Sequence, residues 1–320
     1  MQSAIRLQGV TKTFGATKAV DRLDLEIPAG RLYGLIGPNG AGKTTAIRMV
    51  MSILEPDSGR VEVLGRASAR EAKDRIGYLP EERGVYRKMR AGAFLEYMAH
   101  LKAVPGSLAA ERVGMRLDRL GLGAYAGQRC EELSRGTQQK IQFLAAVLHD
   151  PDLIILDEPF SGLDPVSTAQ LRELILAEHR RGATIVFSTH VMAHAEELCD
   201  HVVMIDRGKK VLDDPVAAIR GRYDPRTIRL QPIDPHADPS ALRSLPGVLA
   251  VTGGDRAITI ELAPDTDPAD ALARAAAAVP SSRVELARPT LEDIFIGLVA
   301  SGGAPGRSAS SSGDPPRAPA

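Results

Sequence analysis

The sequence predicts an α/β fold with an inserted helical subdomain, followed by a small α+β domain. Three observations support this prediction. Short apolar, β-branched runs alternate with helical patterns from Ile5 to about Gly221, which is typical of a mostly parallel sheet covered by helices. A Gly-rich loop directly follows one of these runs and precedes a helical pattern. After Tyr223 the alternation restarts on a smaller scale.

Five apolar runs are predicted as the strands of the first domain, which we place at residues 1–222. They are Leu32–Ile36, Ile76–Leu79, Leu153–Asp157, Thr184–Ser188 and Val202–Ile205. Between the second and the third run lies a mostly helical stretch, about 91–149, interrupted by Pro105 and Gly106 and by a Gly-rich segment at 121–127. This stretch has the size of a helical subdomain inserted into an α/β core.

The second domain, at residues 223–300, is predicted to have the order β-α-β-β-α-β of a ferredoxin-like module. Its expected elements are Thr227–Leu230, Pro239–Leu245, Leu249–Thr252, Ala257–Leu262, Pro268–Val279 and Arg283–Leu286. A last helix, Leu291–Val299, has Thr290 as its expected N-cap and Asp293 to complete a capping box. Residues 301–320 contain no large apolar side chain, so we expect a disordered tail.

Composition excludes several classes of function. Lys plus Arg and Asp plus Glu number 40 each, so no global field would attract nucleic acid or an anionic membrane, and no nucleic-acid partner is expected. Cys130 and Cys199 are too few for a disulfide framework, which fits a reducing compartment. No run approaches the ~18 apolar residues of a membrane span. We therefore expect an intracellular protein whose membrane attachment comes from a partner.

The Gly-rich loop fits the pattern of a phosphate-binding P-loop. Its glycines let backbone N–H groups turn toward phosphates, and the following helix N-terminus adds its positive dipole end. Lys43 is expected to reach the β- and γ-phosphates of ATP, and the Thr44 hydroxyl to bind Mg²⁺. A turn that binds nothing is the alternative, which the flanking strand and helix disfavour. The expected ATP-binding residues are Gly37, Pro38, Asn39, Gly40, Ala41, Gly42, Lys43, Thr44 and Thr45.

Two carboxylates end the run Leu153–Leu156. Asp157 and Glu158 stand at the carboxyl end of a predicted parallel strand, where α/β sheets bind ligands. Asp157 is expected to hold Mg²⁺ and Glu158 to orient and deprotonate the attacking water. A solvated strand end is the alternative, and the accompanying P-loop makes it the weaker one.

With these motifs in place, the chain resembles an ABC transporter ATP-binding subunit from about Ile5 to Asp214. Leu133-Ser-Arg-Gly-Thr-Gln-Gln139 resembles the family signature, with Ser134, Arg135 and Gly136 implied to face ATP held by a partner subunit. Ser134 is also an ordinary helix N-cap. Asp164, in Ser161-Gly-Leu-Asp164, matches the D-loop at the dimer seam. The resemblance implies a head-to-tail dimer, of two copies or with a sister subunit, that holds two ATP molecules.

The resemblance also assigns two residues that the pattern alone would leave structural. His190, after a β-branched strand, matches the switch histidine that contacts the γ-phosphate, although a lone histidine at a strand end is more often structural. Phe14 occupies the position where the family stacks an aromatic ring on adenine. Taken alone, Phe14 would be a core residue.

Two positions depart from the family pattern. Glu81 stands where the family has its Gln-loop glutamine, so a carboxylate is expected to contact Mg²⁺ or water there. Arg135 replaces a glycine and Thr137 a glutamine in the signature. These variant motif sequences, and the module ending in Pro289-Thr-Leu-Glu-Asp-Ile-Phe295, resemble those of bacterial sodium- and drug-efflux ATPases.

The leading interpretation is therefore an ATPase that powers export through a separate membrane permease, at the cytoplasmic face of the membrane. The alternative is a soluble ABC ATPase acting on ribosomes or nucleic acid; one set of motifs and no sustained heptad run disfavour it. A GTPase is disfavoured because no Asn-Lys-x-Asp segment is present. For the C-terminal module, a docking or dimerisation role is favoured over small-molecule regulation.

Overall fold

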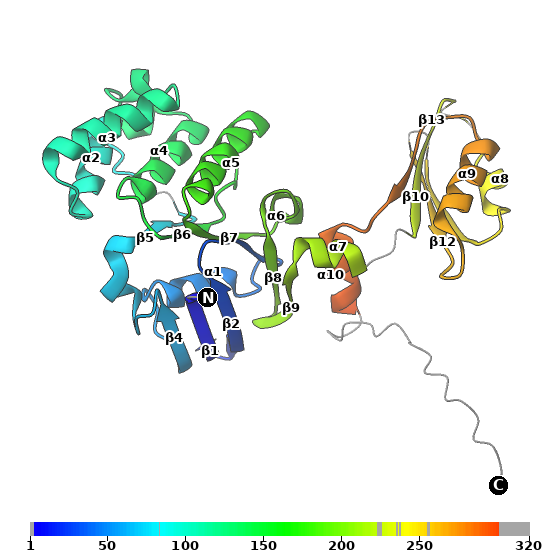
Figure 1. Ribbon diagram of the computed structural model, residues 1–320, viewed down its shortest axis with the longest axis horizontal. Helices are drawn as coiled ribbons and strands as arrows, with labels where there is room; N and C mark the ends of the chain where they lie inside the picture. Colours follow the sequence, from blue (N-terminus) through cyan, green and yellow to red (C-terminus); the bar gives the residue numbers. More distant parts are fainter. Residues whose placement is uncertain are drawn as a thin grey trace, which may run out of the picture.

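The computed structural model describes residues 3–82, 84–222, 226–234, 236, 238–254 and 257–300. The predicted tail, 301–320, lies outside the described residues. Figure 1 shows two sheets and a helical layer in the first part of the chain, and a separate four-stranded sheet with its helices to their right.

The central sheet has six strands in the order β5-β6-β7-β3-β8-β9, and all neighbours run parallel except β8 and β9. All five predicted strands are present, because each is a continuous apolar run buried inside the fold. Ile36 pairs with Thr189, and Asp157 with Ser188, so these strand ends meet at one edge of the sheet. The strands are β3 Leu32–Ile36, β5 Ile76–Leu79, β6 Leu153–Asp157, β7 Thr184–Thr189, β8 His201–Asp206 and β9 Lys209–Pro215.

Helices flank this sheet. α1 packs with the first core cluster, and α5 and α6 pack with the second. The short α7 follows β9, and a 3₁₀ segment, η1, precedes β5. Their bounds are α1 Lys43–Val50, η1 Ala69–Arg75, α5 Pro165–Arg180, α6 Met192–Leu198 and α7 Val216–Arg222.

A second, antiparallel sheet has the order β2-β1-β4, with β1 Ser3–Phe14, β2 Thr17–Pro28 and β4 Ser58–Val63. The sequence analysis did not predict its strands individually. Register shifts along β1, with Gly9 at φ +58°, interrupt the alternation by which a half-buried strand is recognised.

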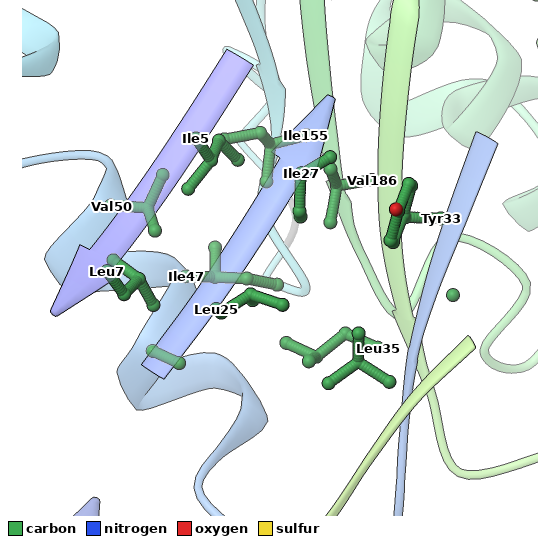
Figure 2. A pocket seen from close by; sticks show the side chains of 13 residues that line it. Ile5, Leu7, Leu25, Ile27, Tyr33, Leu35, Ile47, Val50, Ile155 and Val186 are labelled. Carbon is green, nitrogen blue, oxygen red and sulfur yellow. The ribbon is translucent and has the colours of Figure 1, made fainter. Parts of the chain in front are cut away.

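The two sheets and α1 enclose an apolar core. Figure 2 shows Ile47 of α1 between Leu7 of β1 and Leu25 of β2, with Tyr33 and Leu35 of β3 on the other side of the view. The cavity between them has a volume of about 20 Å³ and is lined by apolar groups, so it is close to the smallest space that holds one water. The support behind the P-loop helix is therefore tightly packed.

The helical subdomain is inserted between β5 and β6, two strands that are direct neighbours in the sheet. This confirms the predicted insertion. Its own core gathers apolar side chains such as Phe94, Leu95, Ile141 and Leu144. The elements are α2 Ala91–Leu101, α3 Gly106–Arg119, η2 Gly123–Tyr125, η3 Cys130–Glu132 and α4 Arg135–Val147.

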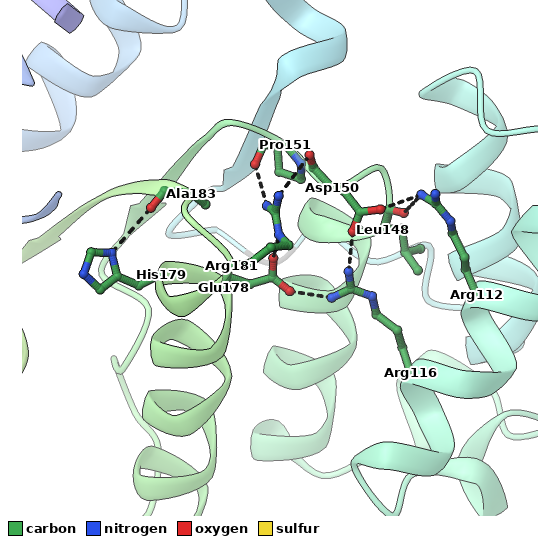
Figure 3. A network of polar contacts seen from close by, with 9 residues as sticks. All are labelled: Arg112, Arg116, Leu148, Asp150, Pro151, Glu178, His179, Arg181 and Ala183. Carbon is green, nitrogen blue, oxygen red and sulfur yellow. Dashed lines mark hydrogen bonds and ion pairs between the residues drawn. The ribbon is translucent and has the colours of Figure 1, made fainter. Parts of the chain in front are cut away.

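A polar network ties α3 of this subdomain to α5 (Figure 3). Arg116 lies 2.5 Å from Glu178 and 2.7 Å from Asp150, and Arg112 lies 2.9 Å from Asp150. Arg181 binds the other Glu178 oxygen at 2.8 Å. The buried Glu178 carboxylate is thus held by two arginines from different parts of the fold.

The C-terminal module has the predicted β-α-β-β-α-β order, and its sheet order is β11-β12-β10-β13 with all neighbours antiparallel. This is a ferredoxin-like arrangement with its own core, which includes Ile228, Leu230 and Ile260. The elements are β10 Thr227–Pro232, α8 Ser240–Arg243, β11 Val248–Gly254, β12 Ala257–Leu262, α9 Pro268–Ala278 and β13 Ser281–Ala287.

The last helix, α10 (Leu291–Ala300), packs on the first domain and not in the core of the module. Leu291, Ile294 and Leu298 are buried in the core cluster that also contains α6. The predicted capping box is confirmed: Asp293 N donates to Thr290 Oγ1 at 3.2 Å, and Thr290 N donates to the Asp293 carboxylate at 2.8 Å. Among the described residues, no helix combines the length and apolar character needed to cross a membrane.

Candidate functional site

The Gly-rich loop joins β3 to α1, and its backbone geometry requires glycine at two places. Gly37 has φ +152° and Gly42 has φ +104°, values in the left-handed region. A Cβ at Gly37 would lie 2.1 Å from the Ile205 carbonyl oxygen, and one at Gly42 2.2 Å from that of Ala19. No other residue type fits either position, so the loop keeps its backbone close to β2 and β8.

Lys43, the first residue of α1, is buried beneath this loop. Its Nζ donates to the carbonyl oxygens of Gly37 at 2.8 Å and Pro38 at 3.0 Å, and lies 3.8 Å from Glu158 Oε1. Burial lowers the pKa of Lys43, while the carboxylates of Glu158 and Asp157 oppose this shift. The arrangement places a cation and a helix N-terminus at one point, which suits an anionic ligand.

Asp157 ends β6 and is 1% exposed. Thr44 Oγ1 donates to its Oδ1 at 3.2 Å, and Ser188 Oγ donates to the same oxygen at 2.6 Å. Its buried Oδ2 has no hydrogen-bond partner among the described residues, and burial raises the pKa of the carboxyl group. An orphaned carboxylate oxygen beside a threonine hydroxyl fits Mg²⁺, which takes one or two protein oxygens and completes its shell with water and phosphate.

Glu158 follows in a left-handed backbone conformation, with φ +48°. Its backbone N donates to Ser188 Oγ at 3.0 Å, and its Oε1 lies 3.0 Å from His190 Nδ1. Ser188 therefore contacts both carboxylate residues. Sequence reasoning gave Ser188 no role. Its position at the end of a β-branched run was the only feature of the sequence that could have indicated a place at this site.

A cavity of about 300 Å³ lies over the loop and is lined by Lys43, Thr44 and Glu158, whereas Gly37, Pro38, Asp157 and His190 are not among its lining residues. Its lining combines the loop and the start of α1 with Glu81 and Glu158, whose roles stay predictions, and with Ala19 of β2, which sequence reasoning missed. The lining residues are Ala19, Asn39, Gly40, Ala41, Gly42, Lys43, Thr44, Thr45, Glu81 and Glu158.

Phe14 does not line this cavity. It ends β1, is 51% exposed, and has Lys12 Nζ 5.9 Å from its ring centroid. An exposed ring is available to a planar ligand, but the structure does not bring it together with the loop. Its contact with adenine stays a prediction.

The signature residues lie at the start of α4 and also outside the cavity lining. Ser134 caps α4 by accepting from Thr137 N at 3.2 Å, which confirms the predicted N-cap. Asp164 caps α5 by accepting from Ser167 N at 2.9 Å and from Ser167 Oγ at 2.6 Å. Gly136 packs on this second cap, since a Cβ there would lie 2.1 Å from Ser167 Oγ. Signature and D-loop are thus in contact within one chain.

Comparison with known proteins agrees with this geometry. Residues 20–161 match the family model described as ABC transporter, and residues 215–299 match one described as the C-terminal domain of DrrA1-3-like ATP-binding proteins. The uncharacterized ABC transporter ATP-binding protein YhaQ of Bacillus subtilis is 39% identical over 292 residues, which cover 91% of this chain and 97% of that protein. The chain belongs to the ABC transporter ATP-binding protein family.

Other relatives of this ABC ATPase include named resistance and transport proteins. DrrA of Streptomyces peucetius, a daunorubicin/doxorubicin resistance ATP-binding protein, is 31% identical over 304 residues, 92% of each chain. The bacitracin transport ATP-binding protein BcrA of Bacillus licheniformis is 35% identical over 227 residues, 69% of this chain and 73% of that protein. A solved ATP-binding subunit of an ABC transporter has a TM-score of 0.63 and 27% identity, covering 68% of this chain and 92% of its own. These relatives favour a transport ATPase over a soluble ATPase acting on ribosomes or nucleic acid.

Proposed function

We propose that this ABC ATPase binds and hydrolyses Mg-ATP between two head-to-tail subunits and powers export through a separate membrane permease. It would act at the cytoplasmic face of the membrane, attached through that permease. The observation that carries the proposal is the convergence of Lys43, Asp157, Glu158 and His190 on one end of the central sheet.

Binding begins with the anion site. On arrival of the nucleotide, Lys43 Nζ exchanges the carbonyl oxygens of Gly37 and Pro38 for the β- and γ-phosphates. Glycine is essential in the loop because a side chain at Gly37 or Gly42 would collide with neighbouring carbonyl oxygens. Phe14 would stack on the adenine from the exposed end of β1.

Asp157 and Thr44 are the residues that would hold Mg²⁺. The Asp157 Oδ2 atom has no other partner in the described structure, and the Thr44 hydroxyl can turn from Oδ1 to the metal. When bound, the ion would neutralise charge on the phosphates. Glu81, at the cavity wall, would contact the ion through water.

Glu158 is the proposed general base. Glu158 lines the cavity; His190 Nδ1 lies 3.0 Å from its carboxylate, and its backbone N donates to the Ser188 hydroxyl. Glu158 would accept the proton of the attacking water, while His190 holds the carboxylate and contacts the γ-phosphate.

The second subunit supplies the other half of the site. Ser134, Arg135 and Gly136 stand at the N-terminus of α4, outside the cavity of their own chain, which suits contact with nucleotide held by another subunit. Arg135 would add a cationic contact to that nucleotide. Asp164 would lie at the same seam, because Ser167 joins the two helix starts.

The permease is proposed to dock on exposed apolar residues at α2: Tyr97 and Leu101 of that helix, and Tyr86, which precedes it. Tyr86 packs edge-on against Tyr97, with ring centroids 5.7 Å apart. Contiguous apolar groups on a surface mark interaction sites. Export is favoured by the relatives named as ATP-binding proteins of daunorubicin/doxorubicin resistance and of bacitracin transport, and by the match of the C-terminal domain to that of DrrA1-3-like proteins.

The test is to purify tagged Glu158→Gln protein with Mg-ATP from its native cells in mild detergent and to identify what accompanies it. A polytopic membrane protein, recovered at one copy per ATPase dimer, supports the proposal. Recovery of ribosomes, of nucleic-acid enzymes, or of self-dimer alone would contradict the export function.

Two further variants test the chemistry. Glu158→Gln should retain ATP binding and lose turnover by orders of magnitude, and full turnover would remove Glu158 from the role of base. Lys43→Ala should weaken nucleotide binding itself. If Glu81 contacts the ion, Glu81→Gln should change the Mg²⁺ dependence of ATP turnover. The matched control is Glu82→Gln, because the Glu82 side chain is 90% exposed. Equal Mg²⁺ dependence in the two variants would exclude the proposed contact.

A further inference from the structure

The helix α10 packs against elements that are distant from it in sequence. One of them is α6, the helix that follows His190. In α10, the apolar residues Leu291, Ile294, Phe295 and Leu298 recur with helical spacing and form one stripe. That stripe packs in the core cluster to which α6, α7 and β8 also contribute. Figure 1 shows α10 beside α7. A buried stripe of this kind fixes the elements on which it packs.

The partner of α10 is the short helix that follows the switch histidine. α6 begins at Met192, two residues after His190, and Met192, Ala195 and Leu198 face the same core as α10. α6 has seven residues and no side-chain hydrogen bond at its N-cap, Val191. A helix this short depends on tertiary packing for its position.

Packing around α6 is uneven. Toward β3 it is tight, because a Cβ on Gly34 would lie 2.8 Å from Cys199 Sγ and 3.1 Å from the Ala195 side chain. Toward α5 it borders a groove of about 380 Å³ lined in part by Leu163 and His194, with an ion pair between Arg172 and Glu197 at the rim. Support from α10 therefore matters for the position of α6.

We propose that α10 is a positioning element for His190: by packing against α6 it fixes the backbone that carries the histidine, and so the 3.0 Å contact of Nδ1 with Glu158. Ile294 and Leu298 are the positioning residues. They share a buried core with Met192 and Ala195 of α6, and we infer that they act through that helix and not on a reacting atom. The inference rests on the proposed catalytic roles of Glu158 and His190.

The experiment uses the full chain with Ile294→Ala plus Leu298→Ala. Its matched control is Ile296→Ala, on the same helix and 60% exposed. Steady-state hydrolysis should show a kcat lowered about tenfold with KM for ATP within about twofold, since displacement of a catalytic group by a fraction of an ångström acts on chemistry more than on binding. Ile296→Ala should match the wild type.

A second measurement separates positioning from general damage. In protein labelled with ¹⁵N-histidine, the His190 ring resonance, assigned by its loss in His190→Ala, should shift in the alanine variant and stay unchanged in Ile296→Ala. Ile294→Val, which keeps most of the side chain, should displace both kcat and the resonance in the same direction as the alanine variant but by a smaller amount. If the alanine variant melts below the assay temperature, Ile294→Val alone carries the test, with kcat and resonance displaced in the same direction by a smaller amount.

His190→Ala distinguishes the possible failures. Wild-type turnover in His190→Ala would withdraw the catalytic role of His190 and this inference with it. If His190→Ala is inactive but the alanine variant of α10 retains kcat and the histidine resonance, this inference alone is overturned. A raised KM at unchanged kcat also overturns it, because the contact with Glu158 would then be intact.

Discussion

Replacing Glu178 by glutamine tests how the helical subdomain is held on the central sheet. The side chain of Glu178 is 8% exposed, and those of its partners Arg116 and Arg181 are 24% and 33% exposed. Removing one member of a fully buried ion pair costs about 3–5 kcal/mol, and of an exposed pair about 0–1 kcal/mol. Because the arginines remain partly hydrated, we expect about 2 kcal/mol for Glu178→Gln.

The assay is calorimetric melting of the full chain. For a domain of this size, about 1 kcal/mol lowers Tm by roughly 2–4 °C, so Glu178→Gln should melt about 4–8 °C below the wild type. The control is Glu173→Gln on the same helix: Glu173 is 70% exposed and lies 3.4 Å from an exposed Arg180. Its expected loss of about 0–1 kcal/mol lowers Tm by at most about 4 °C. Equal melting temperatures for the two variants would refute the argument that burial gives the network its strength.

Three further results are expected. Gly136→Ala should destabilise the chain by about 1–3 kcal/mol through collision with Ser167, and a double-mutant cycle with Ser167→Gly should recover most of that loss; additive effects would contradict the packing. Burial raises the pKa of Asp157, so the folded chain holds this proton more tightly than the unfolded chain does and the ionised form is destabilising above that pKa. Asp157→Asn should therefore melt higher at pH 7 without Mg²⁺ while losing ATPase activity, and a lower Tm would refute this sign. Burial lowers the pKa of His149 from 6.5 to about 4, so stability should fall as pH drops through that interval; urea midpoints should lose this pH dependence in His149→Asn, and an unchanged profile would exclude His149 as its source.

Much of the fold could be predicted because its central strands are short, apolar and buried on both faces. The antiparallel strands β1 and β2 escaped individual prediction, because bulges shift the register and mix inward and outward positions. The helix α10 was predicted together with its capping box. Its packing partner was not, since an apolar stripe shows that a helix is buried and not against which element.

In the candidate site, too, local motifs predicted some residues and contacts between distant segments could not be predicted. Lys43, Thr44 and Asp157 follow from local motifs, and the structure brings them within contact distance of one another or of Glu158. Ser188 could not be predicted, because its hydroxyl bonds Asp157, which is 31 residues away in sequence. Ser167 bonds Asp164 within the same helix cap, but its packing against Gly136 of α4 could not be predicted either. No local pattern distinguishes such a serine from a surface one.

The placement of α7 and α10 has a consequence for whatever the C-terminal module binds. Both helices pack in the core of the ATPase domain, so the module is attached to it at both ends. Only residues 223–226 and 288–290 separate the module from these helices, and extended chains of that length span at most about 14 Å and 11 Å. A molecule bound to the module is thereby confined near the ATPase domain, where a short tether gives an effective concentration on the order of millimolar. A weak contact between that molecule and the ATPase domain would be occupied in such an assembly even where the two separate pieces would not associate.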